Sequence, residues 1–519
     1  MERFNDVFGK AANGEVAEWS GPDLGGAPVN GVAVTVGADS STSINGMAAL
    51  VEADAATLDD SETVSAPRRL TFWESERTRP TELRGASAVS DLVSATGNYL
   101  DVALKSPYLP VSDIRTLQLA RMRQLVELAY RDIPVYQAKY RAAGFSPSDL
   151  RDWDDIQKIP VITKPELIAA FPDSCVNSNY KPEHLYPTRS SGSSGQTLLI
   201  RVDHDAILTD TIQGVRQFVL QSGGKYRPDH LLTHVYTVPW WFDSIDGAYQ
   251  TAFISNLIPP AQVAQHLREL GSQILSLYPS NLEALMPYVD EFASSHYLAV
   301  THSEHSSPAA RRRWSRRLGM PVLDEYSSEE ATRIAIELPD GNYYVCEDTV
   351  HLDVLDAATL QPQTPGKSGL AVVTNLLNEA MPFIRYVQGD YVTVPTHPEP
   401  GTINWSQIAS IDGRLNDAFI NRAGRSIAAG SILDATYRWM FDCDLHLAQF
   451  EMVQRGYDVV EARYVLGRGT MQAKVDASME HLSELLSLCL EHPVKVQNQA
   501  FEVIPVRPGK QRPIRREIE

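Results

Sequence analysis

The stretch Thr188-Arg189-Ser190-Ser191-Gly192-Ser193-Ser194-Gly195-Gln196-Thr197 places four serines and two glycines together, and apolar or β-branched residues follow it at once. Glycine tolerates positive φ and lets backbone amides approach a ligand, and serine hydroxyls rotate to donate hydrogen bonds. Such a loop can present several donors to one anionic group, as phosphate-binding loops do. Runs of Gly and Ser also make plain turns, so these residues alone leave both interpretations open.

The length and charge of the chain limit the classes of protein to which it can belong. Its 519 residues exceed what one hydrophobic core usually supports, so we expect two or three domains. The net charge of -19 argues against binding to nucleic acid or to anionic lipid. No apolar run reaches the about 18 residues of a membrane span, and the first residues do not resemble a signal peptide. We therefore expect a cytoplasmic protein.

The four cysteines, Cys175, Cys346, Cys443 and Cys489, are far apart in the sequence and form no CxxC pair. Cys443 with His446 and Cys489 with His492 share one spacing and offer four zinc ligands in principle. Neither pair matches a usual zinc signature. A disulfide framework is not expected, and a reducing compartment is the default.

Residues 1–66 are rich in Gly, Ala, Ser and Thr and carry only two cations, Arg3 and Lys10, beside several acids. This composition is typical of a mobile acidic extension. A small element that docks a partner is the alternative. Ordered, aromatic-containing sequence begins at about residue 67.

Helices and strands are expected to alternate through the middle of the chain. Ser112 is predicted to cap a first long helix, and Thr163 a short one with Pro165 in its first turn. Strands are expected at 230–236, 273–278 and 297–301, and helices at 205–220, 262–270 and 309–318. This order indicates a parallel sheet with crossover helices, in which ligands gather at the carboxyl ends of the strands. The arginines of the helix at 309–318 are expected to form a solvated face.

The remainder indicates a β-rich subdomain over 342–374 and a small α+β domain over 415–519. In that domain we predict strands at 450–453, 459–466 and 495–504 and one helix at 473–490. The fold class is therefore α/β. A large domain at 67–414, with mostly parallel sheets, precedes a small mobile domain at 415–519.

Aromatic residues gather at the end of the strand predicted at 230–236. Tyr236 ends it, and Trp240, Trp241 and Phe242 follow. Three consecutive aromatic residues cannot all face one core from a regular element, so some are expected to line a substrate pocket. A loop packed onto the core is the other interpretation.

Five stretches stand in one order along the chain. They are the Ser/Gly loop, Asp324-Glu325-Tyr326-Ser327-Ser328-Glu329-Glu330-Ala331, Arg385-Tyr386-Val387-Gln388-Gly389-Asp390, Gly413-Arg414-Leu415-Asn416-Asp417 and Pro508-Gly509-Lys510-Gln511-Arg512. In this order they resemble the adenylate-forming (acyl-AMP) enzymes. The stretches 159–167, 302–304 and 381–386 favour the phenylacetate–coenzyme A ligase-like group. The resemblance covers about residues 105–519.

The resemblance implies ATP-dependent activation of a carboxylic acid, aromatic or arylalkyl, as an acyl-adenylate. The acyl group would then pass to a thiol, that of coenzyme A first of all. Transfer to an amine or to a carrier-protein thiol is one alternative, and a non-catalytic nucleotide-binding scaffold is another. ATP and Mg²⁺ are the implied cofactors. The sequence leaves a homodimer open.

The resemblance also implies roles for individual residues. The phosphate loop would be Ser190, Ser191, Gly192, Ser193, Ser194 and Gly195. Tyr326 would lie against adenine, with Ser303, Glu304 and Asp324 around the base, and Asp390 would bind the ribose hydroxyls. Glu330 would be the Mg²⁺ ligand, Arg414 would hold ribose or phosphate, and Lys510 would reach the α-phosphate and the attacking carboxylate. Asn416 stands at the hinge between the two domains.

The sequence departs from the family pattern at four positions. Gln196 stands where Lys is common and Thr197 where Pro is usual, so the loop keeps a hydrogen-bonding amide but loses a positive charge. Arg189, Arg201 and Lys164 are candidates to compensate. Ser327 replaces Gly, and Glu329 replaces the usual Ser or Thr before Glu330, which adds an acid at the metal position.

Overall fold

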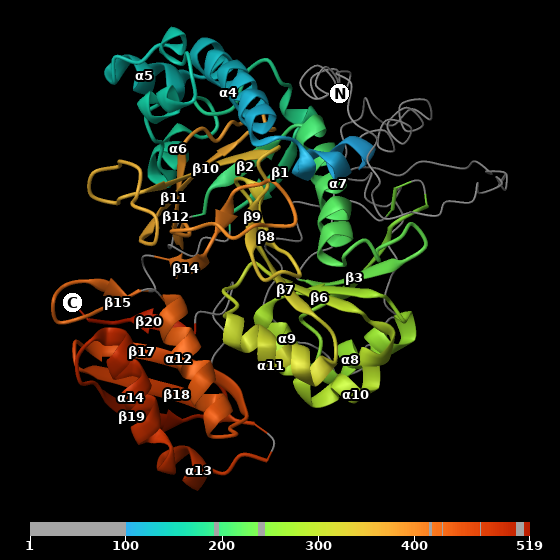
Figure 1. Ribbon diagram of the computed structural model, residues 1–519, viewed down its shortest axis with the longest axis vertical. Helices are drawn as coiled ribbons and strands as arrows, with labels where there is room; N and C mark the ends of the chain where they lie inside the picture. Colours follow the sequence, from blue (N-terminus) through green and yellow to red (C-terminus); the bar gives the residue numbers. More distant parts are fainter. Residues whose placement is uncertain are drawn as a thin grey trace. The chain divides into compact units, whose positions relative to one another are not determined.

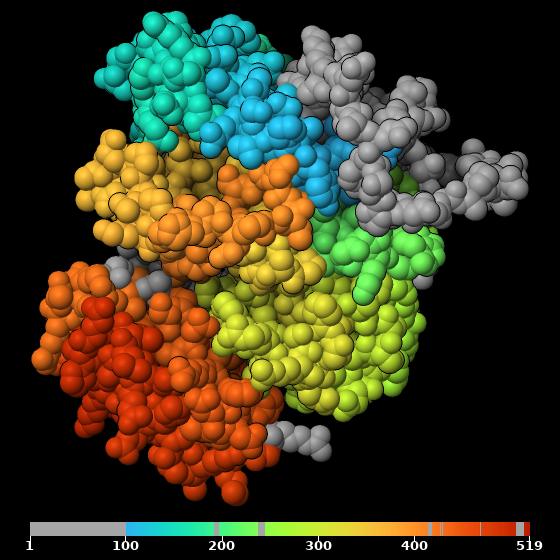
Figure 2. Space-filling view, viewed as in Figure 1, coloured from blue at the N-terminus to red at the C-terminus, as the bar shows by residue number. Residues whose placement is uncertain are grey.

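The computed structural model describes residues 100–190, 197–236, 244–245, 247–414, 418–427, 429–467, 469–504 and 513–518, leaving aside the side chains of Arg414 and Ser426 (Figure 1). Figure 2 shows these ranges coloured along the sequence. The predicted extension, residues 1–66, lies outside them, as do the hinge residues 415–417. The domain boundaries at 66/67 and 414/415 therefore stay predictions.

Helices open the described part of the chain. Helix α4 (Val111–Asp132) begins after Pro110, so the prediction that Ser112 caps it is wrong. Proline fits a helix start because it has no N–H to satisfy, and α5 (Pro134–Ala142) likewise begins at a proline. Thr163 does cap α6 (Lys164–Ala170), where its N–H and hydroxyl donate to Glu166 Oε2 at 2.8 and 2.6 Å.

An eight-stranded sheet forms the centre of the large domain, in the order β13-β9-β8-β7-β6-β5-β3-β4. Its parallel half consists of β3 (Leu231–Tyr236), β4 (Gln250–Ser255), β5 (Ile274–Leu277), β6 (Leu298–His302) and β7 (Val322–Ser328). Its antiparallel half adds β8 (Thr332–Glu337), β9 (Tyr343–Val345) and β13 (Gln407–Ile408). The strands predicted at 230–236, 273–278 and 297–301 are thus confirmed as neighbours in one sheet.

Helices cover both faces of the parallel half. On one face Leu275, Leu277 and Ala299 share a core with α8 (Pro260–Leu270), α9 (Pro279–Leu285) and α11 (Pro308–Leu318). Figure 1 shows these helices and α10 (Val289–Phe292) gathered there. Their neighbours Ile274 and Leu298 point to α7 (His204–Gln221) on the other face. Side chains alternate along a strand, so a sheet with apolar residues on both sides is buried on both.

Two smaller β structures lie in the same part of the chain. The antiparallel sheet β10-β11-β12-β14 contains β10 (Val350–Leu355), β11 (Ser368–Asn375), β12 (Tyr386–Thr393) and β14 (Ser410–Arg414). The hairpin of β1 (Tyr186–Arg189) and β2 (Leu199–Val202) carries the Ser/Gly loop. The β-rich subdomain is therefore confirmed, and it extends beyond the predicted 342–374.

The carboxyl-terminal residues form a separate sheet, β19-β18-β17-β20, with helices beside it. The strands are β17 (Leu447–Gly456), β18 (Val459–Leu466), β19 (Lys495–Ala500) and β20 (Ile514–Arg516), and the helices are α12 (Ala429–Asp442), α13 (Gln472–Ala477) and α14 (Met479–Leu490). The single helix predicted at 473–490 is two helices, which are separated at Ser478. The Ser478 hydroxyl accepts from Trp439 Nε1 at 2.9 Å.

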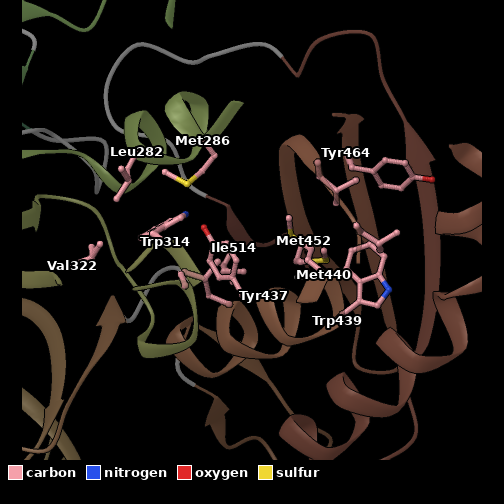
Figure 3. Packing of buried hydrophobic residues seen from close by; sticks show 14 of the residues in the cluster. Leu282, Met286, Trp314, Val322, Tyr437, Trp439, Met440, Met452, Tyr464 and Ile514 are labelled. Atoms are coloured by element: carbon pink, nitrogen blue, oxygen red, sulfur yellow. The ribbon is translucent and has the colours of Figure 1, made fainter. Parts of the chain in front are cut away.

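Buried aromatic and sulfur-containing side chains fill the core of this carboxyl-terminal unit. Trp439, Met440, Met452 and Tyr464 lie together between its helices and strands (Figure 3). Tyr437 packs its ring edge-on against Trp314 of α11, with ring centroids 6.0 Å apart. The α/β fold class is therefore confirmed, with an α+β unit at the carboxyl end. Across the described ranges no helix is both long and apolar enough to cross a membrane.

Candidate active site

The β1–β2 hairpin is closed at the base of the Ser/Gly loop by Ser190. Its N–H donates to the carbonyl of Leu198 at 2.9 Å, and its buried hydroxyl accepts from the Leu198 N–H at the same distance. The bonds between Ser190 and Leu198 thus continue the pairing of β1 with β2. Residues 191–196 lie outside the described ranges, so phosphate binding by Ser191, Gly192, Ser193, Ser194 and Gly195 stays a prediction.

Three predicted site residues are brought together where β7 turns into β8. The Tyr326 hydroxyl donates to Asp390 Oδ2 at 3.0 Å, which joins the predicted adenine and ribose residues. The Tyr386 hydroxyl donates to Glu330 Oε1 at 3.0 Å. Glu330 and Asp390 are both buried, so hydrogen bonds within the protein, rather than water, orient their carboxylates.

Glu329 connects this turn to the hairpin. Its Oε2 accepts from the Thr188 hydroxyl at 2.7 Å, and Thr188 lies on β1, two residues before Ser190. The acids at 329 and 330 therefore stand next to the strand that carries the Ser/Gly loop. An acid at 329 adds negative charge where ATP phosphates are expected.

Ser303 and Glu304 follow the carboxyl end of β6, as expected for binding residues on a parallel sheet. Ser303 has φ of +67°, a region that non-glycine residues rarely adopt and that often marks functional sites. Its hydroxyl lies 3.0 Å from His302 Nδ1. Glu304 Oε2 accepts from the Ser280 N–H at 3.0 Å, at the start of α9.

Asp324 lies in a buried network rather than at an exposed edge. Its carboxylate accepts from the hydroxyls of Thr301 and Tyr343 at 2.6 and 2.7 Å. Arg311 Nη1 is 3.8 Å from the same carboxylate, and Arg311 Nη2 donates to Glu337 at 3.1 Å. The geometry favours a supporting role for Asp324 beneath the site; a contact with the base stays a prediction.

The same network corrects the expectation for the basic helix. Arg311 is 4% exposed, so the arginines of α11 do not all form a solvated face. Two carboxylates, those of Asp324 and Glu337, compensate its charge below the sheet. Charge alone did not reveal this difference, because successive arginines of the run point to different faces of the helix: Arg311 is buried and Arg312 is exposed.

Aromatic rings meet at the ends of three parallel strands. Tyr236 ends β3, Tyr278 follows β5 and His302 ends β6. Their ring centroids are 4.9, 5.5 and 5.6 Å apart in pairs. Burial raises the pKa of Tyr236, so its hydroxyl stays protonated at neutral pH. The sequence prediction included Tyr236 but missed Tyr278 and His302, although each stands at or beside a predicted strand end.

Several predicted residues cannot be compared with the structure. Trp240, Trp241, Phe242, Asn416 and Lys510 lie outside the described residues. The backbone of Arg414 is described, and in β14 it stands opposite Asp390 of β12. The pairing places Arg414 next to the predicted ribose residue, while its contact with ribose or phosphate stays a prediction.

The residues fit a magnesium ion carried by a nucleotide better than a metal site made by the protein alone. Within the described ranges, no three His, Cys, Asp or Glu side chains come together as a metal site, and all four cysteines are free thiols. Among the described residues, the two cysteine–histidine pairs are not gathered into a metal-binding cluster. Glu330 offers one oriented carboxylate, and Mg²⁺ on ATP typically takes one or two carboxylates with phosphate and water oxygens.

Relatives of known activity share much of this chain. It is 26% identical over 332 residues to the phenylacetate–coenzyme A ligase of Escherichia coli (strain K12), a match that covers 60% of this chain and 74% of that protein. The ligase of Pseudomonas putida is 26% identical over 330 residues, with 60% and 73% covered. These matches support the resemblance of the chain to the adenylate-forming enzymes, and within them to the phenylacetate–coenzyme A ligase-like group.

Solved structures confirm the adenylate-forming fold. A 2-hydroxyisobutyryl-CoA ligase in its postadenylation state, in complex with R3-HIB-AMP, aligns with a TM-score of 0.67 at 19% identity and covers 80% of this chain and 91% of that one. The same ligase in its thioesterification state, with 2-HIB-AMP and CoA, aligns with a TM-score of 0.54. No protein-family model matches the chain.

Proposed function

We propose that this adenylate-forming enzyme activates a carboxylic acid with ATP and passes the acyl group to coenzyme A. One observation carries the proposal: Tyr326, Glu330 and Asp390, which lie up to 64 residues apart in sequence, meet beside the hairpin of the Ser/Gly loop. The relatives that share 60% of the chain are phenylacetate–coenzyme A ligases.

The proposed reaction has two steps. A carboxylate oxygen of the acid attacks the α-phosphorus of ATP, the bond to the β-phosphate breaks, and pyrophosphate leaves. The coenzyme A sulfur, which loses its proton, then attacks the carbonyl carbon, and AMP leaves. The first step concentrates negative charge on phosphate oxygens, where preorganised donors and a cation are the most effective stabilisers.

The chain would supply these groups from several elements. Tyr326 would stack on adenine, and Asp390 would accept from the ribose hydroxyls. Glu330 would ligate Mg²⁺, which when bound neutralises phosphate charge. Arg414 and Lys510 would place cations on the ribose or phosphate and on the reacting carboxylate. Rotation at Asn416 would exchange Lys510 for the thiol-binding face of the small domain.

The acid is proposed to be aromatic or arylalkyl. The rings of Tyr236, Tyr278 and His302 stand at strand ends, where ligands collect in parallel sheets. Flat rings provide contact area for an aromatic acid. Trp240, Trp241 and Phe242 directly follow β3 and would extend this wall. We also propose a cytoplasmic location, because free thiols are typical of a reducing compartment.

The test is release of pyrophosphate across a panel of aromatic and arylalkyl acids, with and without coenzyme A. The proposal predicts acid-dependent release and formation of an acyl-coenzyme A detected by mass spectrometry. Release without consumption of coenzyme A, together with transfer to an amine or a phosphopantetheine arm, would favour the alternative acceptors. ATP binding without release for any acid would favour the non-catalytic scaffold.

A further inference from the structure

Alternate side chains of β12 contact alternate residues at the end of β7 and in the turn that follows it. Tyr386 donates to Glu330 at 3.0 Å, Gln388 Nε2 donates to Ser328 Oγ at 2.7 Å, and Asp390 accepts from Tyr326 at 3.0 Å. Moving two residues forward along β12 moves the contact two residues backward in the other segment, from Glu330 to Ser328 and then to Tyr326. We call these three pairs the side-chain ladder.

The side-chain ladder joins two different sheets. β7 belongs to the eight-stranded sheet and β12 to the four-stranded sheet. No backbone pairing between β7 and β12 fixes the turn, since β12 pairs with β11 and β14. The position of the turn relative to β12 therefore depends on side chains.

A bulge in β12 brings its side chains to this position. Val387 pairs with Val372 and Tyr391 with Leu370, so residues 388–390 stand opposite Ala371 alone. Gly389 lies at the centre with φ of +80°, which glycine adopts without strain. Bulges redirect side chains next to active sites, and here the bulge falls between the partners of Ser328 and Tyr326.

Further hydrogen bonds hold the turn from inside. The Ala331 N–H donates to Ser328 Oγ at 3.1 Å, and Asn375 Nδ2 donates to the Glu330 carbonyl at 3.1 Å. Ser328 Oγ thus accepts hydrogen bonds both from the Ala331 N–H in the turn and from Gln388 Nε2 of β12. Tyr386 is 1% exposed, so its hydroxyl bond to Glu330 is shielded from water. A bond to a carboxylate in such a place is stronger than one between neutral groups.

We propose that Tyr386 and Gln388 are positioning residues that hold the metal carboxylate and the adenine ring in one register, so that metal binding and nucleotide binding are coupled through β12. The inference rests on the proposed function, because it takes Glu330 as the metal ligand and Tyr326 as the adenine residue. Tyr386 acts at the Glu330 end of the side-chain ladder. Gln388 lies between Tyr386 and Asp390 on β12, so it affects the positions of both Glu330 and Tyr326.

The test measures ATP binding by calorimetry as Mg²⁺ is varied, and needs no acid substrate. Tyr386→Phe should raise the Mg²⁺ concentration for half-maximal binding by at least about fivefold, because a hydrogen bond to a charged group is lost. Metal-free binding of adenosine should not change. Gln388→Met should weaken both the Mg²⁺-dependent binding of ATP and the metal-free binding of adenosine. The matched control is Tyr391→Phe, which removes a hydroxyl from the same strand outside the ladder.

A double-mutant cycle separates positioning from general loss of structure. In a Glu330→Gln background, Tyr386→Phe should cause no further change in Mg²⁺ dependence, because its partner is already altered. Hydrogen exchange of the ligand-free protein should rise at residues 326–331 in Tyr386→Phe and not in Tyr391→Phe. Equal Mg²⁺ dependence in Tyr386→Phe and the wild type, or additive effects in the cycle, would overturn the inference. Absence of ATP binding by the wild type would instead contradict the proposed function and remove the basis of the inference with it.

Discussion

The Thr188 hydroxyl donates to Glu329 Oε2 at 2.7 Å and so ties the strand that carries the Ser/Gly loop to the acid next to Glu330. Two departures from the family pattern therefore act on one region. Gln196 removes a positive charge from the loop, and Glu329 adds a negative charge beside its base. Both changes are expected to weaken the attraction for ATP phosphates.

Glu329→Gln keeps the side-chain length and an acceptor for Thr188 but removes the charge. Loss of like-charge repulsion at a partly solvated site is worth about 0.5–1 kcal/mol, so KM for ATP should fall about two- to fivefold. The change should shrink at high ionic strength, since salt screens exposed charges. Glu480→Gln, on the exposed face of α14, is the control. A rise in KM for ATP would show instead that Glu329 assists binding.

The buried pair of Arg333 and Asp210 holds β8 to α7. Their side chains are 2% and 7% exposed, and Arg333 Nε also donates to Gln217 at 2.6 Å. Asp210→Ala should lower the free energy of unfolding by about 3–5 kcal/mol, because it removes the nearer of the two carboxylates that compensate a buried guanidinium and leaves Glu325, 3.9 Å away. Urea denaturation measures the loss.

A surface pair provides the comparison for that prediction. Arg317 and Asp290 are 47% and 81% exposed, and their nitrogen and oxygen lie 2.8 Å apart. Asp290→Ala should leave the free energy of unfolding nearly unchanged, because water and salt screen the pair. Similar losses in Asp210→Ala and Asp290→Ala would contradict the structural role given to Arg333.

His296 makes stability depend on pH. Its Nδ1 donates to the carbonyl of Phe292 at 3.0 Å, so in the neutral ring Nε2 accepts from the Ser272 hydroxyl at 3.1 Å. Burial lowers the pKa of His296 from 6.5 to about 4. The folded state then binds fewer protons than the unfolded state between these values, and its stability is full above pH 6.5 and falls as the pH drops toward 4.

The free energy of unfolding that this shift removes by about pH 4 is on the order of 3 kcal/mol, since one pKa unit corresponds to about 1.4 kcal/mol. His296→Gln removes the titrating group, so its free energy of unfolding should change less than that of the wild type from pH 6.5 to 4. Urea denaturation over a pH series measures both. Parallel curves for the two proteins would exclude His296 as the source.

The sequence allowed prediction of the parts of the fold that depend on local patterns. Thr163 and Glu166 lie three residues apart and form the predicted cap, and the apolar runs at 230–236 and 273–278 became neighbouring parallel strands. Ser112 was a wrong cap because Pro110 two residues earlier already begins the helix. Local propensity cannot choose between two adjacent start signals.

The side-chain ladder was beyond prediction for a different reason. The sequence suggested Tyr326, Glu330 and Asp390 individually, but Tyr386 meets Glu330 across 56 residues and from another sheet. One sequence contains no signal for such a contact. The ring of Tyr278 and the burial of Arg311 also depend on which strands and helices become neighbours. Chemistry-bearing residues were therefore easier to predict than the residues that orient them.

The most direct test of the central claim is exchange of radiolabelled pyrophosphate into ATP in the absence of coenzyme A. The account predicts exchange by the wild type only when a suitable carboxylic acid is present. It also predicts a fall of at least about 100-fold in Lys510→Ala, the size expected when one charge-stabilising group is lost from a transition state. Exchange that is independent of added acid, or that is unchanged in Lys510→Ala, would contradict acid activation by this chain.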